Sequence, residues 1–211
     1  MSFVHFAKRE IQFKIVYYGP GLSGKTTNLE VVHESINPDA KGEMISVATS
    51  GDRTLFFDFM PLVAEAIEGY KTHFQLYTVP GQIMYGETRR LVLRGVDGLV
   101  FVADSQWDKM AENVESFEDL VANLAAQGDD IDAMPYVLQY NKRDLPNIAP
   151  SHYMDFVLND REERRASMLA TASTSQGVFE CLNMVCRLVL HKFIEEHVAD
   201  DQKSEAELVL V

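Results

Sequence analysis

Short apolar runs alternate along this chain with longer segments in which apolar positions recur at helical spacing. The apolar runs predict strands over residues 13–18, 44–47, 55–60, 74–79, 98–104, 136–140 and 168–171, with 64–68 as a weaker candidate. The amphipathic segments predict helices over 27–36, 84–93, 112–126, 152–158 and 178–197. Such alternation predicts an α/β fold, in which a mostly parallel central sheet carries helices on both faces. We expect a single domain over residues 1–198 and an acidic, disordered or loosely packed tail over 199–211.

The turn after the first long apolar run carries the clearest chemical signal. Residues 19–26 read GPGLSGKT, which matches the pattern G-x-x-x-x-G-K-[ST] between a predicted strand and a predicted helix. In that context the glycines allow backbone N–H groups to surround a diphosphate, and Lys25 can reach the outer phosphates. The hydroxyl of Thr26 can bind Mg²⁺. A glycine-rich turn with an exposed lysine is the alternative, but its strand–turn–helix context favours a nucleotide-binding P-loop.

A second polar cluster follows the predicted strand 136–140, where Asn141, Lys142 and Asp144 lie at its carboxyl end. Open α/β sheets bind ligands at this edge. The Asp144 carboxylate can accept hydrogen bonds from the ring N–H and the exocyclic amine of guanine, whereas adenine lacks both donors. The cluster therefore predicts guanine recognition, although a solvated turn would use similar residues.

The segment between these clusters contains residues suited to sensing and hydrolysing a γ-phosphate. Gly81 follows the predicted strand 74–79, and its N–H can approach a phosphate because no Cβ intervenes. Gln82 is placed to orient an attacking water, Thr54 offers a hydroxyl to Mg²⁺, and Arg53 could stabilise charge in the transition state. An ordinary Pro-Gly turn and a hairpin with a solvated arginine would give the same spacings.

Charge and composition limit the classes of partner that the chain is expected to bind. The net charge of −13 and pI near 4.8 argue against nucleic acid or an anionic membrane as the main partner. We expect no direct membrane anchor, because the chain has no run of 18 apolar residues and no lipidation motif. Cys181 and Cys186 have a spacing that suits neither a disulfide nor a metal site, so we expect buried thiols in a cytoplasmic protein.

These motifs together resemble the Ras-like small GTPases, and within them the bacterial gliding-motility GTPases. The resemblance covers roughly residues 3–197, and it is carried by residues 15–28, 52–59, 76–82, 101–106 and 139–146. It implies a GTP/GDP switch that controls cell polarity and motility, in a cytoplasmic protein that is recruited to a cell pole. It also implies slow GTP hydrolysis without an activator, motility effectors as partners, and Mg²⁺ as cofactor.

The resemblance assigns roles residue by residue. It implies that Gln82 and Arg53 are catalytic and that Thr26 and Thr54 bind the metal. The nucleotide-binding set that it implies is Gly19, Gly21, Leu22, Ser23, Gly24, Lys25, Thr26, Thr27, Gly81, Asn141, Lys142, Asp144, Thr171, Ala172 and Ser173, where the Ala172 N–H would meet the guanine carbonyl.

This chain departs from most small GTPases at Thr78, where they carry an aspartate that holds a magnesium-bound water. A hydroxyl can bond that water but supplies no charge, and Asp52 or Asp58 could compensate. The resemblance further implies a homodimeric roadblock-type GTPase-activating protein that inserts no arginine of its own, so that Arg53 would serve. Two other functions stay open: a GTP-binding scaffold module that does not cycle, and a P-loop phosphotransferase.

Overall fold

The computed structural model describes residues 3–5, 8–49, 52–59, 70–81 and 86–208. Its centre is one mixed sheet in the order β3-β4-β5-β2-β6-β7-β8, with β1 paired to β2 outside this path. The strands are β1 Phe3–His5, β2 Glu10–Tyr18, β3 Ile45–Thr49, β4 Asp52–Phe59, β5 Lys71–Thr78, β6 Gly98–Asp104, β7 Tyr136–Asn141 and β8 Ser167–Leu169.

The five central strands are parallel to one another. They pair as β5 with β2, β2 with β6, β6 with β7 and β7 with β8, whereas β3, β4 and β1 each join an antiparallel pair. Because parallel strands end at the same edge of a sheet, the segments that follow β2, β5, β6 and β7 converge there. Both predicted ligand-binding clusters follow strands of this group.

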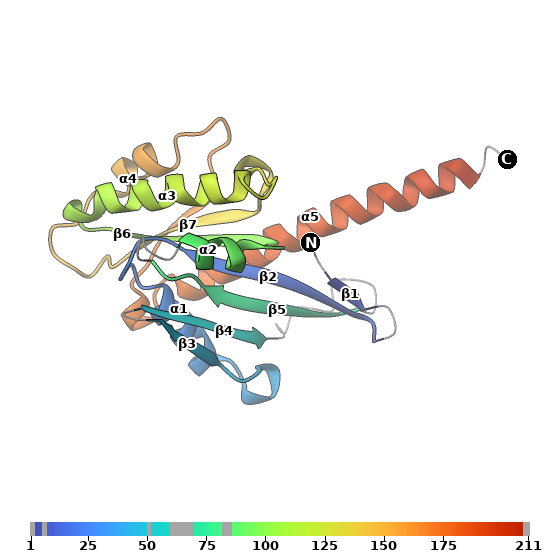
Figure 1. Cartoon of the computed structure of the whole chain (residues 1–211), viewed down its shortest axis with the longest axis horizontal. Helices are drawn as coiled ribbons and strands as arrows, with labels where there is room; N and C mark the ends of the chain where they lie inside the picture. Colours follow the sequence, from blue (N-terminus) through green and yellow to red (C-terminus); the bar gives the residue numbers. More distant parts are fainter. Residues whose placement is uncertain (1–2, 6–7, 50–51, 60–69, 82–85, 209–211) are drawn as a thin grey trace.

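Helices cover both faces of the sheet (Figure 1). Their bounds are α1 Lys25–Ser35, α2 Gly86–Leu93, α3 Met110–Ala125, α4 Ser151–Leu158 and α5 Val178–Leu208. Short 3₁₀ turns occur at η1 Pro38–Ala40, η4 Trp107–Lys109, η5 Ile131–Ala133 and η6 Ala172–Thr174. Helices α1 and α5 lie on one face, and α2, α3 and α4 lie on the other.

A separate apolar core fills the space under each helical layer. On the first face Leu29 and Val185 pack with sheet residues such as Phe74, and all three are fully buried. On the second face Leu120 packs with Phe101. Successive residues of a strand point to opposite faces, so a strand that is covered on both sides needs a continuous apolar run. This is why β6 and β7 are buried along their whole length.

The predicted α/β architecture is confirmed, and most element boundaries agree to within a few residues. Strand β1 was not predicted, and it is only three residues long. The last strand is Ser167–Leu169, where we expected 168–171. The weak strand candidate 64–68 lies outside the described residues, as do the first two residues of the helix expected over 84–93.

Helix α5 continues to Leu208, where we expected a disordered or loosely packed tail from residue 199. Figure 1 shows the end of α5 projecting away from the sheet. Acidic residues do not prevent a helix, and each additional residue adds one backbone hydrogen bond once the helix has nucleated. The division at residue 198 between domain and tail stays a prediction.

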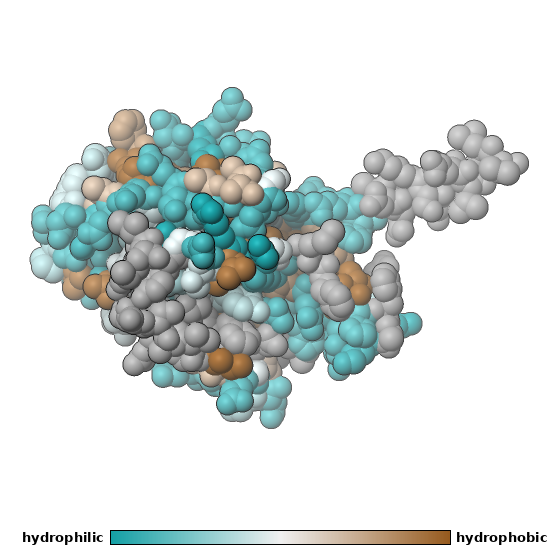
Figure 2. Space-filling view, in the orientation of Figure 1, coloured by the Kyte–Doolittle hydropathy of each residue, from teal (hydrophilic) through white to brown (hydrophobic). Residues whose placement is uncertain are grey.

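The described surface on view in Figure 2 is mostly hydrophilic, and the two cysteines are buried inside the molecule. On the face in Figure 2, hydrophilic residues cover most of the described surface, and hydrophobic residues show in small separate groups. Within the described residues, no helix combines the length and the apolar character that a membrane crossing requires. Cys181 and Cys186 are free and buried, and burial raises the pKa of the Cys181 thiol to about 12.

Candidate nucleotide-binding site

The predicted P-loop connects the end of β2 to the start of α1. Gly19 has φ +143°, and a Cβ at this position would lie 2.2 Å from the carbonyl oxygen of Val102. Gly24 has φ +101°, and a Cβ there would lie 2.2 Å from Nδ2 of Asn141. L-residues with a side chain rarely adopt such φ values. Both glycines of the motif are therefore required by the local backbone and by a close neighbour.

Lys25 is buried inside the loop that it follows. Its ammonium donates to the carbonyl oxygens of Gly19 at 2.9 Å and Pro20 at 2.6 Å, and the residue is 5% exposed. The loop therefore curls around a positive charge at the amino-terminal end of α1, where the helix dipole is also positive. This is the electrostatic arrangement that an anionic phosphate requires.

The remaining residues of the predicted phosphate-binding set lie around this charge. Leu22 has φ +61° and is 89% exposed, so its side chain points away from the loop. The side chain of Ser23 is buried, and its Oγ has no hydrogen-bond partner among the described residues. Gly21, Thr26 and Thr27 are partly exposed. A buried hydroxyl without a hydrogen-bond partner costs free energy unless a ligand or water bonds to it. The Ser23 hydroxyl is therefore available for a hydrogen bond to a ligand.

A pair of buried amides holds the start of α1 against the sheet. Asn28 Nδ2 donates to Gln139 Oε1 at 2.8 Å, and Gln139 Nε2 donates to Asn28 Oδ1 at 2.9 Å. The same Asn28 amide nitrogen also donates to the carbonyl oxygen of Gly24 at 2.9 Å. Both side chains are fully buried. The sequence analysis missed this pair, although the polar Gln139 within the apolar run 136–140 was a signal.

Asn141 joins the two predicted clusters. Its Nδ2 donates to the carbonyl oxygen of Ser23 at 2.8 Å, and its Oδ1 accepts from the backbone N–H of Ala172 at 2.9 Å. One buried side chain therefore connects the P-loop, the end of β7 and the turn η6. We expected the Ala172 N–H to meet a guanine carbonyl, but in this structure it is bonded to Asn141.

The other residues of the predicted base-reading cluster differ in exposure. Lys142 has φ +63°, and its ammonium forms an ion pair with Asp104 at 2.6 Å. Asp144 is exposed, and no described residue donates a hydrogen bond to its carboxylate. Next to the cluster, Thr171 is buried at 4% exposure, whereas Ser173 is exposed. The structure thus brings 19–27, 141–144 and 171–173 to one edge of the sheet.

The segment that follows β5 lies directly against the P-loop. A Cβ at Gly81 would lie 2.5 Å from the backbone nitrogen of Gly21, so only glycine allows this approach. Thr78, at the end of β5, is fully buried.

The predicted catalytic residue Gln82 lies outside the described residues. Arg53 and Thr54 belong to β4, opposite Ala48 and Val47 of β3, and their side chains are not described.

The described residues fit a magnesium nucleotide in part. Mg²⁺ binds oxygen ligands and usually keeps several waters, so one protein hydroxyl and the phosphates can hold it. Thr26, at the start of α1, supplies such a hydroxyl beside Lys25. The described residues contain no group of three or more His, Cys, Asp or Glu side chains that could hold a metal by themselves. A metal at this edge would therefore depend on the phosphates of the nucleotide for most of the negative charge that balances its own.

The covered parallel sheet, the P-loop after β2 and the Asn-Lys-x-Asp cluster after β7 define the domain of a small GTPase. Over 190 residues, which make up 90% of this chain and 96% of the relative, the sequence is 54% identical to the mutual gliding-motility protein MglA of Myxococcus xanthus (strain DK1622). The chain therefore belongs to the MglA family, as the motifs predicted. A scan against protein-family models matched none of them.

Proposed function

We propose that this chain is a regulatory GTPase, a GTP/GDP switch that controls polarity and motility in a bacterial cell. The observation that carries this proposal is the connection of the P-loop to the base-reading cluster through Asn141. A phosphate-binding loop and a guanine-reading carboxylate at one sheet edge suit a guanine nucleotide better than any other ligand. The likeness to the gliding-motility protein supports the biological role.

The proposed binding site divides the nucleotide between the two clusters. The backbone N–H groups of residues 19–27 and the ammonium of Lys25 would hold the phosphates. Asn141, Lys142 and Asp144 would hold the base, together with Thr171, Ala172 and Ser173. For Ala172 this requires that its N–H leave Asn141 or share its hydrogen between two acceptors.

A bound Mg²⁺, held by Thr26 and Thr54, would neutralise charge on the outer phosphates.

Hydrolysis would depend on residues of the two segments that flank β5. Gln82 would orient the attacking water, and the Arg53 guanidinium would stabilise charge on the transferred phosphoryl group. Gly81 lies against Gly21 and so could report the γ-phosphate to the segment after it. Thr78 offers no negative charge to a magnesium-bound water, which is one reason to expect slow hydrolysis without a partner.

The proposed partner is a homodimeric roadblock-type activator of the MglB kind, together with motility effectors in the cytoplasm. Such an activator would order the catalytic segments and would supply no arginine. The acidic net charge of −13 gives no support to nucleic acid as a partner.

Nucleotide binding and phosphate release, measured with and without a roadblock-type activator, test this function. We expect selective binding of GDP and GTP over ADP and ATP, slow multiple-turnover hydrolysis alone, and a clear acceleration by the activator. Tight GTP binding without hydrolysis under any condition would indicate a scaffold module that does not cycle. Transfer of the γ-phosphate to an acceptor other than water would indicate a phosphotransferase.

A further inference from the structure

We propose that Asp104 is a positioning residue for the nucleotide base and that it acts through Lys142. The inference rests on the function proposed above, because it takes Lys142 to be a base-contacting residue. Asp104 is the last residue of β6, and in the parallel register it lies beside Asn141, the last residue of β7. It therefore occupies the sheet edge where the base is expected, yet it belongs to neither motif.

The Asp104 carboxylate is fixed by its surroundings. The residue is 2% exposed, and its Oδ1 accepts from the backbone N–H of Gln106 at 3.1 Å. The buried side chain of Asn113, on α3, holds the Asp104 backbone from both sides: Oδ1 accepts the Asp104 N–H at 3.0 Å, and Nδ2 donates to the Asp104 carbonyl oxygen at 2.8 Å. A carboxylate held in this way is a rigid acceptor.

Lys142 donates to the second oxygen of this carboxylate. Its Nζ lies 2.6 Å from Asp104 Oδ2, and the two side chains are 26% and 3% exposed. An anion with so little exposure needs a partner, and Lys142 is the cation that forms an ion pair with Asp104. The pair therefore holds the ammonium end of Lys142 at a defined place.

The backbone end of Lys142 is also fixed. Its φ of +63° is a left-handed conformation, and the N–H of Leu145 donates to its carbonyl oxygen at 3.2 Å. The N–H of the next residue, Arg143, donates to the carbonyl oxygen of Ala170 at 3.1 Å. With both ends held, the flexible lysine stem is confined to one path beside Asp144. A side chain that is already ordered loses less entropy when it contacts a ligand.

The stem of a lysine presents methylene groups, which can cover the flat face of a purine without reading its edge. Asp144, by contrast, would read the edge through hydrogen bonds. We therefore expect Asp104 to affect the affinity for any 6-oxopurine diphosphate equally, whereas Asp144 should affect the choice among them. GDP and inosine diphosphate, which lacks the exocyclic amine, separate the two roles.

Dissociation rates of both diphosphates from Asp104→Asn, Lys142→Met and the double variant test the proposal. Asp104→Asn should accelerate dissociation of both diphosphates alike, by about tenfold, since a hydrogen bond to a charged group is lost. In the Lys142→Met background the same change should have an effect of at most about twofold, because partners in one interaction are not additive. Asp104→Ser, whose hydroxyl can still accept from Gln106, is the second variant if the amide variant fails to fold.

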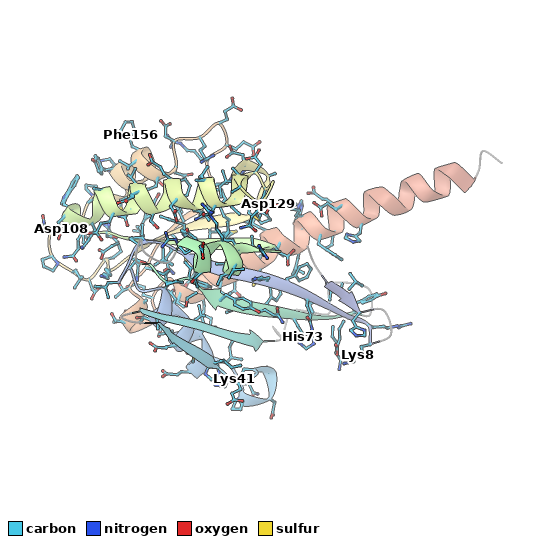
Figure 3. All side chains as sticks on the ribbon, viewed as in Figure 1. Lys8, Lys41, His73, Asp108, Asp129 and Phe156 are labelled. Atoms are coloured by element: carbon cyan, nitrogen blue, oxygen red, sulfur yellow. The ribbon has the colours of Figure 1, made fainter. Side chains whose placement is uncertain are left out.

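Asp108→Asn is the matched control, because it makes the same substitution at an exposed carboxylate four residues along (Figure 3). It should leave both dissociation rates unchanged. Wild-type rates in Asp104→Asn and Asp104→Ser would overturn the proposal, and so would an equal effect of Asp104→Asn with and without Lys142. Wild-type protein that fails to bind GDP would refute the proposed function itself, and the role of Asp104 would fall with it.

Discussion

Asn141 Nδ2 donates to the carbonyl oxygen of Ser23 over 2.8 Å, and this bond joins the end of β7 to the P-loop. Gly24 makes the contact possible, because a Cβ on it would lie 2.2 Å from the same nitrogen. The predicted base-reading cluster and the P-loop are therefore one structural unit, although 118 positions separate Ser23 from Asn141 in the sequence. A substitution in one of the two should therefore change how the other binds a ligand.

The first prediction concerns Gly24→Ala. The added methyl group must displace Asn141, and the residue must keep φ +101°, so we expect guanine nucleotide affinity to fall about tenfold or more. Isothermal titration with GDP measures the loss. Gly128→Ala is the control, since Gly128 has φ +86° but nothing within 4 Å of a Cβ. Equal affinity in the wild type and Gly24→Ala would contradict the coupling.

A second prediction concerns the identity of the base. Asp144 is exposed and accepts no hydrogen bond from the described residues, so its carboxylate can serve a ligand. Asp144→Asn should weaken GDP binding and strengthen xanthosine diphosphate binding, because the amide can donate to the carbonyl that replaces the exocyclic amine. Competition between the two diphosphates measures the preference. An unchanged preference for GDP would mean that Asp144 does not read the base.

A third prediction concerns Gln82 and Arg53, whose side chains the structure does not describe. If they orient water and neutralise charge, Gln82→Ala and Arg53→Ala should each reduce activator-stimulated hydrolysis, and for the arginine the loss should be about 10³-fold or more. Single-turnover kinetics with a roadblock-type activator measures these rates. Both variants must retain GTP binding for the comparison to be fair. Near-native stimulated rates in both would refute the catalytic assignment.

A partly buried ion pair connects α2 to α3 and to the residue before the P-loop. Arg89 Nε lies 2.9 Å from Asp119 Oδ2, with side-chain exposures of 7% and 36%. The same oxygen accepts from the hydroxyl of Tyr18 and, at 3.0 Å, from Asn123 Nδ2. Because α2 follows the segment that contains Gln82, this network fixes the helix that begins directly after that segment.

The fourth prediction follows from that network. Asp119→Asn removes the negative charge from an oxygen that accepts from Arg89, Tyr18 and Asn123, so the free energy of unfolding should fall by about 2 kcal/mol. Urea denaturation at fixed nucleotide concentration measures the change. Asp132→Asn, which breaks the more exposed pair with Arg161, should cost no more than about 1 kcal/mol. Equal losses in the two variants would mean that the Asp119 network contributes no more than a surface pair.

The parallel core of the fold could be predicted because strands that are buried on both faces must be apolar along their length. Residues 98–104 and 136–140 met that condition and became β6 and β7. The helical end of α5 could not be predicted in the same way, because residues 199–208 lack the apolar stripe that marks a packed helix.

The site could be predicted only as far as its motifs extend. The motifs identified the P-loop and the Asn-Lys-x-Asp cluster, since each is a local run of residues. The hydrogen-bond partners of the site residues could not be predicted from the sequence. Asn28 and Gln139 are 111 positions apart, and Lys142 and Asp104 are 38 positions apart. A hydrogen bond between distant residues depends on the strand order and register, and a single sequence does not state these.

Hydrogen exchange of the GDP-bound protein, compared with the protein bound to a non-hydrolysable GTP analogue, tests the central claim that this chain is a nucleotide switch. Residues 50–58 and 79–85 should exchange differently in the two states, because Thr54 and Gly81 are expected to engage the γ-phosphate and Mg²⁺. The difference should include β4, which pairs with both β3 and β5, and not only the loops beside it. Equal protection across residues 50–60 and 79–85 in the two states would contradict the switch and favour a scaffold module that does not cycle.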